Sequence, residues 1–209
     1  MITLKIDSQA NLYPLNRLPG AAVAQIKARL TFPNPAFLDA ERRGFYAGHI
    51  PREIRGYRQE GNLLTLPRGF TGQLIGILRG AGVRFRIEDR RRVLPEVEFT
   101  FHGKLHDFQE EAVEAMAARD FGTLAAPTGS GKTVMALHMV ARRRQPTIIV
   151  VHTKELADQW VAQIGKFLGI PAREVGIIGG GKKRIGSKIS VALVQSLYPR
   201  LCSSLGRYG

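Results

Sequence analysis

The spacing of apolar and polar positions changes character near residue 95 of the 209-residue chain. Before that point, segments that alternate every second residue, as strands do, are interspersed with short helical patterns and turn residues. The clearest segments are ITLKI (2–6) and VRFRIEDRRR (83–92) with strand periodicity, and AAVAQIKARL (21–30) and TGQLIGILRGAG (71–82) with helical periodicity. Strands and helices mixed in this way predict a small α+β domain over residues 1–97.

Two local features of this first domain follow from residue types. The stretch EIRGYRQEGNLLTLPRG (53–69) predicts two strands joined at Glu60-Gly61. Thr71 is a candidate cap for the helix at 71–82, and Gly80 or Gly82 is expected to end that helix.

From residue 98 onward, strand patterns alternate regularly with helical ones. Helices are predicted at 105–120, 132–144 and 154–169, and short buried strands at 122–126, 147–152, 174–181 and 189–194. Strand–helix alternation of this kind predicts an α/β domain with a parallel sheet covered by helices, over residues 98–209. Phe108 is expected on the apolar stripe of the first of these helices, and Trp160 in the core.

Charge adds a candidate partner to this picture. The chain has 31 Lys and Arg against 17 Asp and Glu, a net charge of +14. Such a surface favours nucleic acid over a merely soluble role. Arg84 and Arg86, with the arginines at 90–92, could follow a phosphate backbone or form a solvated strand face, and both interpretations stay open. The arginines at 142–144 could cap a helix end or contact DNA.

Several classes of protein are disfavoured by composition. No apolar run has the length of a membrane span, and the first residues do not have the pattern of a signal peptide. Cys202 is the single cysteine and therefore has no internal disulfide partner. We expect a cytoplasmic protein without a membrane partner, in a bacterium or a phage-infected host, with the nucleus as the alternative for a eukaryotic source.

The stretch APTGSGKT, Ala126 to Thr133, carries the strongest chemical signal. It leaves a predicted strand and enters a predicted helix, which is the context that a phosphate-binding loop requires. Lys132 is expected to reach the β- and γ-phosphates of ATP, and the Thr133 hydroxyl to bind Mg²⁺. The remaining phosphate-binding candidates are the loop residues Pro127, Thr128, Gly129, Ser130 and Gly131.

The surroundings of this loop resemble those of superfamily 2 helicases and translocases over roughly residues 100–205. LHDFQEEAV (105–113) is similar to the segment in which that family reads the adenine edge, and IIVVHTKELADQW (148–160) is similar to motif Ia. VGIIGGGKKR (175–184) and ISVALVQSL (189–197) resemble the Ib and Ic segments of the branch that contains the xeroderma pigmentosum group B helicase and phage recombination helicases. His152 stands where the family often has proline, and His106-Asp107 replaces a common Arg-Pro.

This resemblance implies a RecA-like motor domain at 98–209, incomplete in this sequence, and a set of binding residues. Gln109 would contact adenine. The nucleic-acid backbone would be held by Thr153 and Lys154 (Ia), by Gly180, Gly181 and Lys182 in a flexible basic loop (Ib), and by Gln195 and Ser196 (Ic). The resembling branch works on DNA, so DNA is preferred over RNA.

No DEAD- or DEAH-like acidic box occurs in the 209 residues. Phosphoryl transfer needs the acid, a water-positioning group and an arginine in addition to the lysine. We therefore expect the amino-terminal portion of an ATP-dependent DNA helicase or translocase, with little ATP hydrolysis by the chain alone. Two alternatives stay open: a nucleotide-gated nucleic-acid-binding module without catalysis, and a double-strand translocase subunit of a restriction or remodelling motor.

Overall fold

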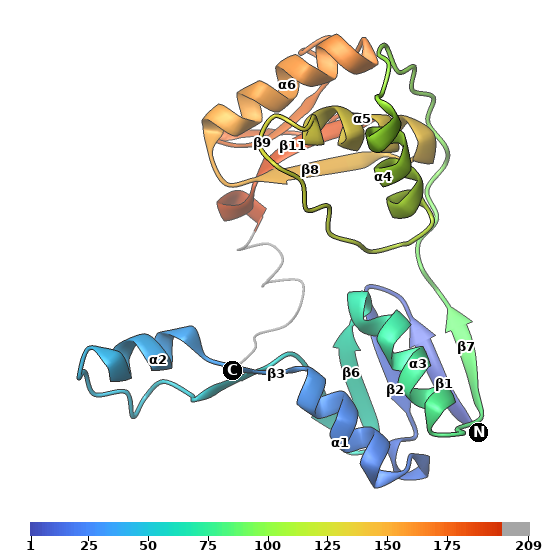
Figure 1. The fold of residues 1–209 in the computed structure, drawn as a ribbon, viewed down its shortest axis with the longest axis vertical. Coiled ribbons are helices and arrows are strands. Elements are labelled where there is room, and N and C mark those ends of the chain that lie inside the picture. The colour runs from blue at the N-terminus through green and yellow to red at the C-terminus, as the bar shows by residue number, and fades with distance from the viewer. Residues whose placement is uncertain (198–209) are drawn as a thin grey trace. The chain divides into compact units, whose positions relative to one another are not determined.

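The computed structural model describes residues 1–197. The chain divides into two compact units, Met1–Val93 and Leu94–Gly209, which are described separately here (Figure 1). Cys202 lies outside the described residues. Within residues 1–197, no helix combines the length and apolar character that crossing a bilayer demands.

A five-stranded sheet forms the base of the first unit. Its strand order is β5-β6-β2-β1-β7, with β7 parallel to β1 and every other pair antiparallel. Leu4 lies opposite Leu12 on one side and Ile87 on the other. The strands are β1 (Ile2–Ile6), β2 (Gln9–Tyr13), β5 (Arg58–Glu60), β6 (Leu63–Pro67) and β7 (Phe85–Asp89).

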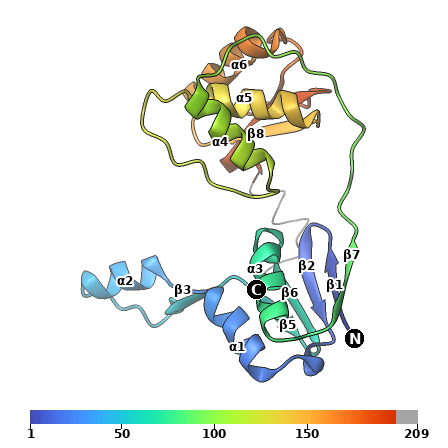
Figure 2. The same ribbon diagram turned by 45° about the vertical axis from the view of Figure 1, so that its right-hand side comes forward.

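Two helices cover one face of this sheet. They are α1 (Gly20–Arg29) and α3 (Thr71–Gly80), and each follows a short 3-10 turn, η1 (Leu15–Arg17) and η2 (Arg68–Phe70) (Figures 1 and 2). Ile26 of α1 and Leu74 of α3 are fully buried against the strands, in one cluster with Leu4, Leu12 and Leu64. The period-two pattern of the strands and the helical pattern of α1 and α3 therefore point their apolar positions into the same core.

The predicted hairpin at 53–69 forms only in its second part. β5 and β6 pair antiparallel around Gly61, whose φ of +53° suits glycine. The residues before them form β4 (Glu53–Arg55), which pairs with β3 (Thr31–Pro33) instead. The capping role predicted for Thr71 is wrong: α3 begins at Thr71, and its hydroxyl donates a hydrogen bond back to the Arg68 carbonyl at 2.7 Å.

A four-stranded sheet is the centre of the second unit. Its order is β10-β9-β11-β8, with β9, β11 and β8 parallel and β10 antiparallel to β9. The strands are β8 (Thr147–Val151), β9 (Gly176–Gly179), β10 (Lys182–Arg184) and β11 (Ile189–Leu193), and the helices are α4 (Asp107–Ala117), α5 (Lys132–Arg143) and α6 (Lys154–Leu168). Leu137, Ile164 and Val191 are fully buried in its main core, and Trp160 packs against that core as predicted.

Two expectations for this sheet are wrong. Residues 122–126 form no strand, and the chain passes from α4 to α5 without joining a ladder. β8 is therefore an edge strand of the described sheet, and Ile148 and Val150 are 51% and 48% exposed instead of buried. An extended segment becomes a strand only when a neighbouring strand accepts its hydrogen bonds, which local pattern does not reveal.

Candidate nucleotide and nucleic-acid site

The phosphate-binding loop lies between residue 126 and the start of α5. Gly129 and Gly131 have φ of +83° and +81°, a region that glycine enters without strain. Pro127 O accepts hydrogen bonds from the backbone N–H and the hydroxyl of Ser130, at 3.3 and 2.8 Å, which closes the turn through Thr128 and Gly129. Gly131 is the N-cap of α5, and no side chain caps this helix. Its first N–H groups are thus left for an anion, as a phosphate cradle requires.

Gly131 is required for a second reason as well. A Cβ atom built on it would lie 2.4 Å from Nε2 of Gln109. Gly131→Ala should therefore displace the Gln109 amide, and a left-handed backbone at alanine adds about 1–2 kcal/mol of strain. We expect a lower melting temperature together with weaker ATP binding, measured by thermal unfolding and by titration with a fluorescent ATP analogue. Gly72→Ala is the control, because Gly72 has open space around its Cβ position. Equal behaviour of the two variants would contradict the predicted role of Gly131.

Lys132 is the first residue of α5, and its ammonium turns back onto the loop. It donates hydrogen bonds to the carbonyls of Ala126 and Pro127, both at 2.8 Å. Lys132 is exposed and Thr133 half-buried at the second position of the helix. Phosphate oxygens could take the place of these two carbonyls, because both kinds of oxygen accept from an ammonium and the phosphate adds an opposite charge.

Gln109 joins the loop to the helix before it. The Gln109 side chain is 6% exposed, and its Oε1 accepts from the His106 backbone N–H at 3.0 Å while its Nε2 donates to Ser130 O at 2.9 Å. A pocket of about 800 Å³ adjoins it, lined by residues 104–109 with Gly129 and Ser130. For Gln109 to hydrogen-bond the edge of an adenine, one of these two hydrogen bonds would have to break.

Phe108 is the residue of this pocket that sequence analysis placed wrongly. It is 56% exposed instead of lying on the buried stripe of α4, and its ring stacks on that of His106, with centroids 5.9 Å apart and planes 4° apart. Because α4 begins at Asp107, Phe108 falls in the first turn, where the pocket lies. Its position directly before Gln109, in the segment that resembles the adenine-reading segment, was the available signal.

Arginines at the end of α5 connect it to α4. Arg142 donates to both carboxylate oxygens of Glu114, with Nη2 to Oε2 at 2.9 Å. Arg143 donates to the carbonyls of Met116 and Ala117, at the carboxyl end of α4. Arg144 ends α5 in a left-handed conformation and pairs with Glu96. Of the two alternatives, these contacts favour a capping role, but the capped end belongs largely to the neighbouring helix α4.

The stability that the Glu114–Arg142 ion pair adds to the fold should depend on pH. The pair's hydrogen bond and charge hold the pKa of the Glu114 carboxyl below its ordinary value. A lowered folded-state pKa means that the pair stabilises the fold above the unfolded pKa, about 4.3, and that this contribution disappears as pH falls through the folded value. Arg142→Met should lower the melting temperature near neutral pH but match wild type in acid, as followed by circular dichroism. A difference that persists in acid would assign the effect to packing.

The candidate nucleic-acid segments occupy the ends of strands and starts of helices in the second unit. Thr153 is the N-cap of α6, and its hydroxyl accepts from the Leu156 N–H at 3.3 Å. The Glu155 carboxylate bonds its own backbone N–H and the Thr153 hydroxyl, which keeps the pKa of Glu155 below its ordinary value. The Glu155 carboxylate already occupies this helix start. Of Thr153 and Lys154, the exposed Lys154 is therefore the better candidate to contact a phosphate.

The structure brings the three segments together. Lys154, Gly180 and Lys182 line one pocket of about 250 Å³, to which Arg184 also contributes. The Gln195 side chain donates from Nε2 to the His152 carbonyl at 2.9 Å, which joins the third segment to the first. Gly181 and Ser196 do not line that pocket: Gly181 lies in the turn before β10, and Ser196 in the helical turn at 194–197.

The basic segment at 179–183, predicted as a flexible loop, forms the end of β9, a turn and the start of β10. Gly180 and Gly181, with φ of +57° and +80°, make a tight turn between β9 and β10, and Lys182 pairs with Gly179 across the hairpin. Arg184, which sequence analysis left out, is placed by this hairpin and donates to Val175 O at 2.6 Å. The run of three glycines followed by three cations concealed β10, the second strand of this hairpin, because such residues are weak strand formers on their own.

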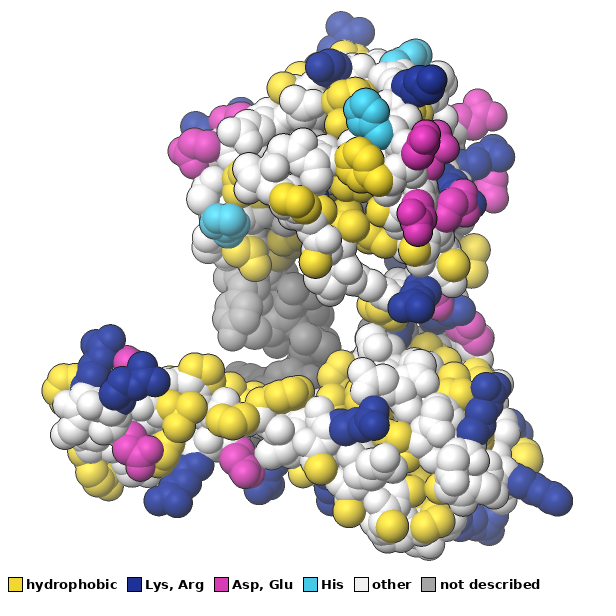
Figure 3. Space-filling view, viewed as in Figure 1, with side chains coloured by type: hydrophobic (Ala, Val, Ile, Leu, Met, Phe, Trp, Pro, Cys, Tyr) yellow, Lys and Arg dark blue, Asp and Glu magenta, His cyan; other side chains and the backbone are white. Residues whose placement is uncertain are grey.

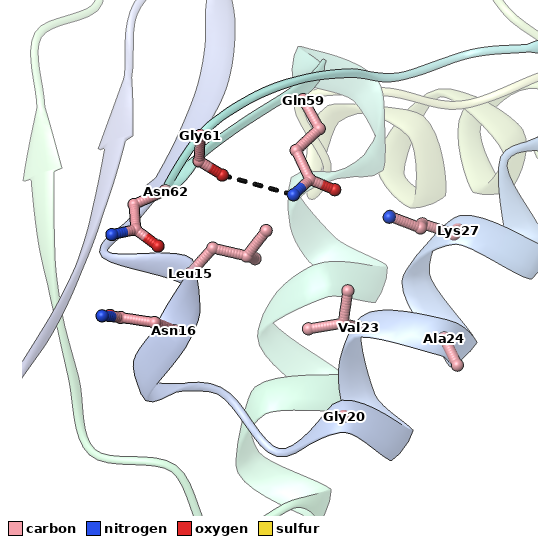
Figure 4. Close-up of a pocket in the computed structure, with 9 residues that line it drawn as sticks. All are labelled: Leu15, Asn16, Gly20, Val23, Ala24, Lys27, Gln59, Gly61 and Asn62. Atoms are coloured by element: carbon pink, nitrogen blue, oxygen red, sulfur yellow. Dashed lines mark hydrogen bonds between the residues drawn. The ribbon is translucent and has the colours of Figure 1, made fainter.

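The first unit contains a separate pocket of about 420 Å³ between α1 and the β5–β6 turn (Figure 4). Leu15 and Val23 supply its apolar wall, Lys27 is its single charge, and Gln59 donates to Gly61 O at its rim. It holds no carboxylate, and nowhere in residues 1–197 do three or more His, Cys, Asp or Glu side chains gather as a metal would need.

The chain is similar in sequence to a protein family and to several named helicases and translocases. Residues 102–206 match the family described as "Type III restriction enzyme, res subunit". "DNA 3'-5' translocase XPB2" of Sulfurisphaera tokodaii is 40% identical over 97 residues, which cover 46% of this chain and 21% of that protein. "Putative DNA 3'-5' helicase Rad25" of Haloarcula marismortui is 30% identical over 115 residues, covering 55% of this chain and 18% of the relative. The chain thus spans about a fifth of the length of these two relatives.

A solved structure shares the fold of nearly the whole chain. The UvsW helicase of bacteriophage T4 superposes with a TM-score of 0.62 and 15% sequence identity, covering 95% of this chain and 76% of its own. At that identity the match speaks for fold alone, a parallel-sheet domain of the RecA kind in the second unit. The family match, by contrast, includes the phosphate-binding loop and covers half of the sequence. This chain belongs to the family of the type III restriction enzyme res subunit, and over the same part of its sequence it is similar to proteins named as XPB and Rad25 helicases or translocases.

Proposed function

We propose that this chain supplies the ATP-binding loop and part of the DNA-binding surface of an ATP-dependent DNA helicase or translocase. The observation that carries the proposal is the convergence of Lys154, Gly180 and Lys182 on one pocket in the unit that also holds the phosphate-binding loop. The relatives are named as DNA helicases and translocases, which favours DNA over RNA as the partner. No observation favours the alternative of a binding module without catalysis.

ATP would be held at the amino end of α5. Gly129 to Gly131 would present backbone N–H groups to the phosphates, Lys132 would neutralise them, and the Thr133 hydroxyl would be a ligand of Mg²⁺. Bound Mg²⁺ supplies positive charge that offsets the charge of the phosphates. The uncapped start of α5 and the absence of a Cβ at Gly131 support this fit. Adenine would lie in the pocket beside Phe108 and Gln109.

Hydrolysis by the 209-residue chain alone should be negligible. Lys132 and Thr133 are present, but the sequence contains no acidic box to hold the metal and orient the water. Phosphate release measured with and without DNA tests this point. DNA-stimulated release that disappears in Lys132→Ala would contradict it.

DNA would contact the pocket through its phosphates. Lys154 and Lys182 are exposed cations on the rim of a partly apolar pocket, so each is placed for one phosphate contact. The same nucleic-acid backbone is proposed to contact four further residues, Thr153, Gly181, Gln195 and Ser196. The first unit, over residues 1–97, is proposed as an additional nucleic-acid-binding domain. A motor that works on DNA belongs in the compartment that holds DNA, the cytosol of a bacterium or phage-infected host, or a nucleus.

The double variant Lys154→Ala/Lys182→Ala tests the DNA surface. Each lost phosphate contact should lower the slope of log affinity against log salt by about 1, so the slope should fall by about 2 with little change in sequence preference. Fluorescence anisotropy of a labelled oligonucleotide across a salt series measures this slope. Lys166→Ala/Lys188→Ala removes the same charge elsewhere in the unit and serves as the control. If both double variants lose the same amount of slope, the effect is due to net charge alone, which would contradict the proposed surface.

A further inference from the structure

Residues 31–56 form an arm that extends from the sheet of the first unit. β3 and β4 are its two-stranded base, and α2 (Pro35–Arg42) with the following loop forms its outer part (Figures 1 and 2). Asn34 is the single buried residue of the arm, at 8% exposure. The arm therefore has no apolar core of its own.

Polar contacts hold the arm in shape. Asn34 caps α2 through Oδ1, which accepts from the Ala36 N–H at 3.0 Å, and its Nδ2 donates to Pro51 O at 2.8 Å. Its backbone N–H donates to Arg52 O at 2.9 Å. Farther out, the Phe45 N–H donates to Ala40 O at 2.9 Å. A segment built this way keeps its conformation without burying its large apolar side chains.

Those apolar side chains are instead displayed to solvent. Phe45 and Tyr46, directly after α2, are 66% and 84% exposed. Phe32 and Ile54, which face each other across β3 and β4, are 51% and 47% exposed. Clustered exposure of large apolar groups marks an interaction surface more often than chance. We call residues 42–52 the arm tip.

The ring of Tyr46 is supported by the arm tip itself. A Cβ atom built on Gly48 would lie 2.2 Å from the Tyr46 hydroxyl oxygen, so the end of the ring rests against the Gly48 backbone and a side chain at residue 48 would displace it. The His49 ring lies beside it, with centroids 6.3 Å apart. One side of the Tyr46 ring is thus fixed on the loop while most of its surface stays open, as in a preformed platform for a flat ligand.

Cations outnumber acids at the arm tip. Arg42, Arg43 and Arg52 lie in it, whereas the acids, Glu41 and Glu53, flank it and Asp39 pairs with Arg43 at 3.1 Å. The Arg52 guanidinium stands over the Phe37 ring, 5.4 Å from its centroid. Figure 3 shows Lys/Arg and hydrophobic side chains next to one another on this part of the molecule, with some Asp/Glu side chains among them. A second copy of a chain with net charge +14 would meet like charge here, which disfavours self-association and favours a polyanion.

We propose that the arm tip binds unpaired nucleotides, with bases stacking on Tyr46 and Phe45 and phosphates contacting Arg42 and Arg52. Exposed aromatic rings bordered by cations suit single strands, because bases in a duplex have no free face. The inference rests on the proposed function in taking nucleic acid as the partner. It adds a contact for single strands in the first unit, separate from the pocket of Lys154 and Lys182.

The test measures affinity for a labelled oligothymidine and for a blunt duplex of the same length by fluorescence anisotropy. Phe45→Ala/Tyr46→Ala should weaken single-strand binding about tenfold or more and leave duplex binding within about twofold. Tyr46→Phe, which keeps the ring, should bind like wild type. Phe32→Ala/Ile54→Ala, on the same arm, is the matched control and should also retain binding.

A mutant cycle tests the platform itself. Gly48→Ala should displace the Tyr46 ring and weaken single-strand binding, but it should add nothing when Tyr46 is already alanine. Unchanged single-strand affinity in Phe45→Ala/Tyr46→Ala, or an equal loss in Phe32→Ala/Ile54→Ala, would overturn the inference. A change of oligomeric state with these variants would also overturn it. If Lys154→Ala/Lys182→Ala still weakens binding in that case, the proposed function stands without the arm.

Discussion

Lys132→Ala is expected to weaken ATP binding about 10- to 100-fold, because the ammonium is the one side-chain cation in the phosphate-binding loop. Hydrogen bonds to charged groups contribute about 1.5–3 kcal/mol each, and 1.4 kcal/mol is a factor of ten in affinity. Lys132 already points its ammonium along the loop, at the carbonyls of Ala126 and Pro127. Titration with a fluorescent ATP analogue, or calorimetry, measures the change.

Adenosine separates loss of charge from collapse of the loop. A ligand without phosphates should bind Lys132→Ala and wild type equally, because only the pocket beside Phe108 and Gln109 contacts the base in the proposed arrangement. Lys166→Ala, an exposed lysine on α6, controls for net charge. An equal loss of adenosine and ATP binding would show that alanine distorts the loop, and would contradict a phosphate-specific role for Lys132.

Leu137→Ala is expected to lower the free energy of unfolding of the second unit by about 2–5 kcal/mol. Leu137 is fully buried in the main core, where α5 packs beside α6 and the sheet. Its truncation leaves a cavity below the helix that carries Lys132. The fluorescence of Trp160, the single tryptophan, reports this unit because Trp160 packs against the same core. Denaturant titration gives the shift of the unfolding midpoint.

Ile185→Ala removes a similar volume from the surface of the same unit. Ile185 is 76% exposed, so its truncation should leave the midpoint nearly unchanged. Saturating ATP should restore part of the stability that Leu137→Ala removes, because a ligand that binds the folded state alone stabilises that state. Equal midpoints for the two variants would contradict the assignment of Leu137 to a closely packed core.

Local features of the sequence predicted the glycine turn at 129–131 and the helix start at Lys132 well. Gly129, Gly131 and Lys132 act within one turn of chain, so residue type and spacing nearly determine the backbone they adopt. The helices starting at Gly20, Lys132 and Lys154 were predicted for the same reason, since their apolar period of 3.6 residues is a property of each segment alone. Strand pairing between segments far apart in the sequence could not be predicted in the same way. The stretch at 122–126 has the apolar character of a strand but no ladder partner among the described residues.

The sequence pattern also did not predict which apolar side chains are exposed. Phe108 lies in a helical apolar pattern, yet it is exposed and borders the adenine pocket candidate. Whether an apolar side chain is buried depends on what the rest of the chain places over it, and no short window of sequence contains that information. The same holds for Arg143, whose partners belong to the neighbouring helix.

The sequence by itself determined which residue types are available: a glycine-rich turn with Lys132, a strongly basic chain, and three segments that resemble nucleic-acid contacts of helicases. What only the tertiary structure decided is which of these groups meet. Lys154 and Lys182 share a pocket because parallel β9, β11 and β8 place the ends of separate strands side by side. Gln109 reaches the phosphate-binding loop because α4 packs on α5. Such contacts arise from the burial of apolar faces far apart in sequence, which is a property of the whole fold.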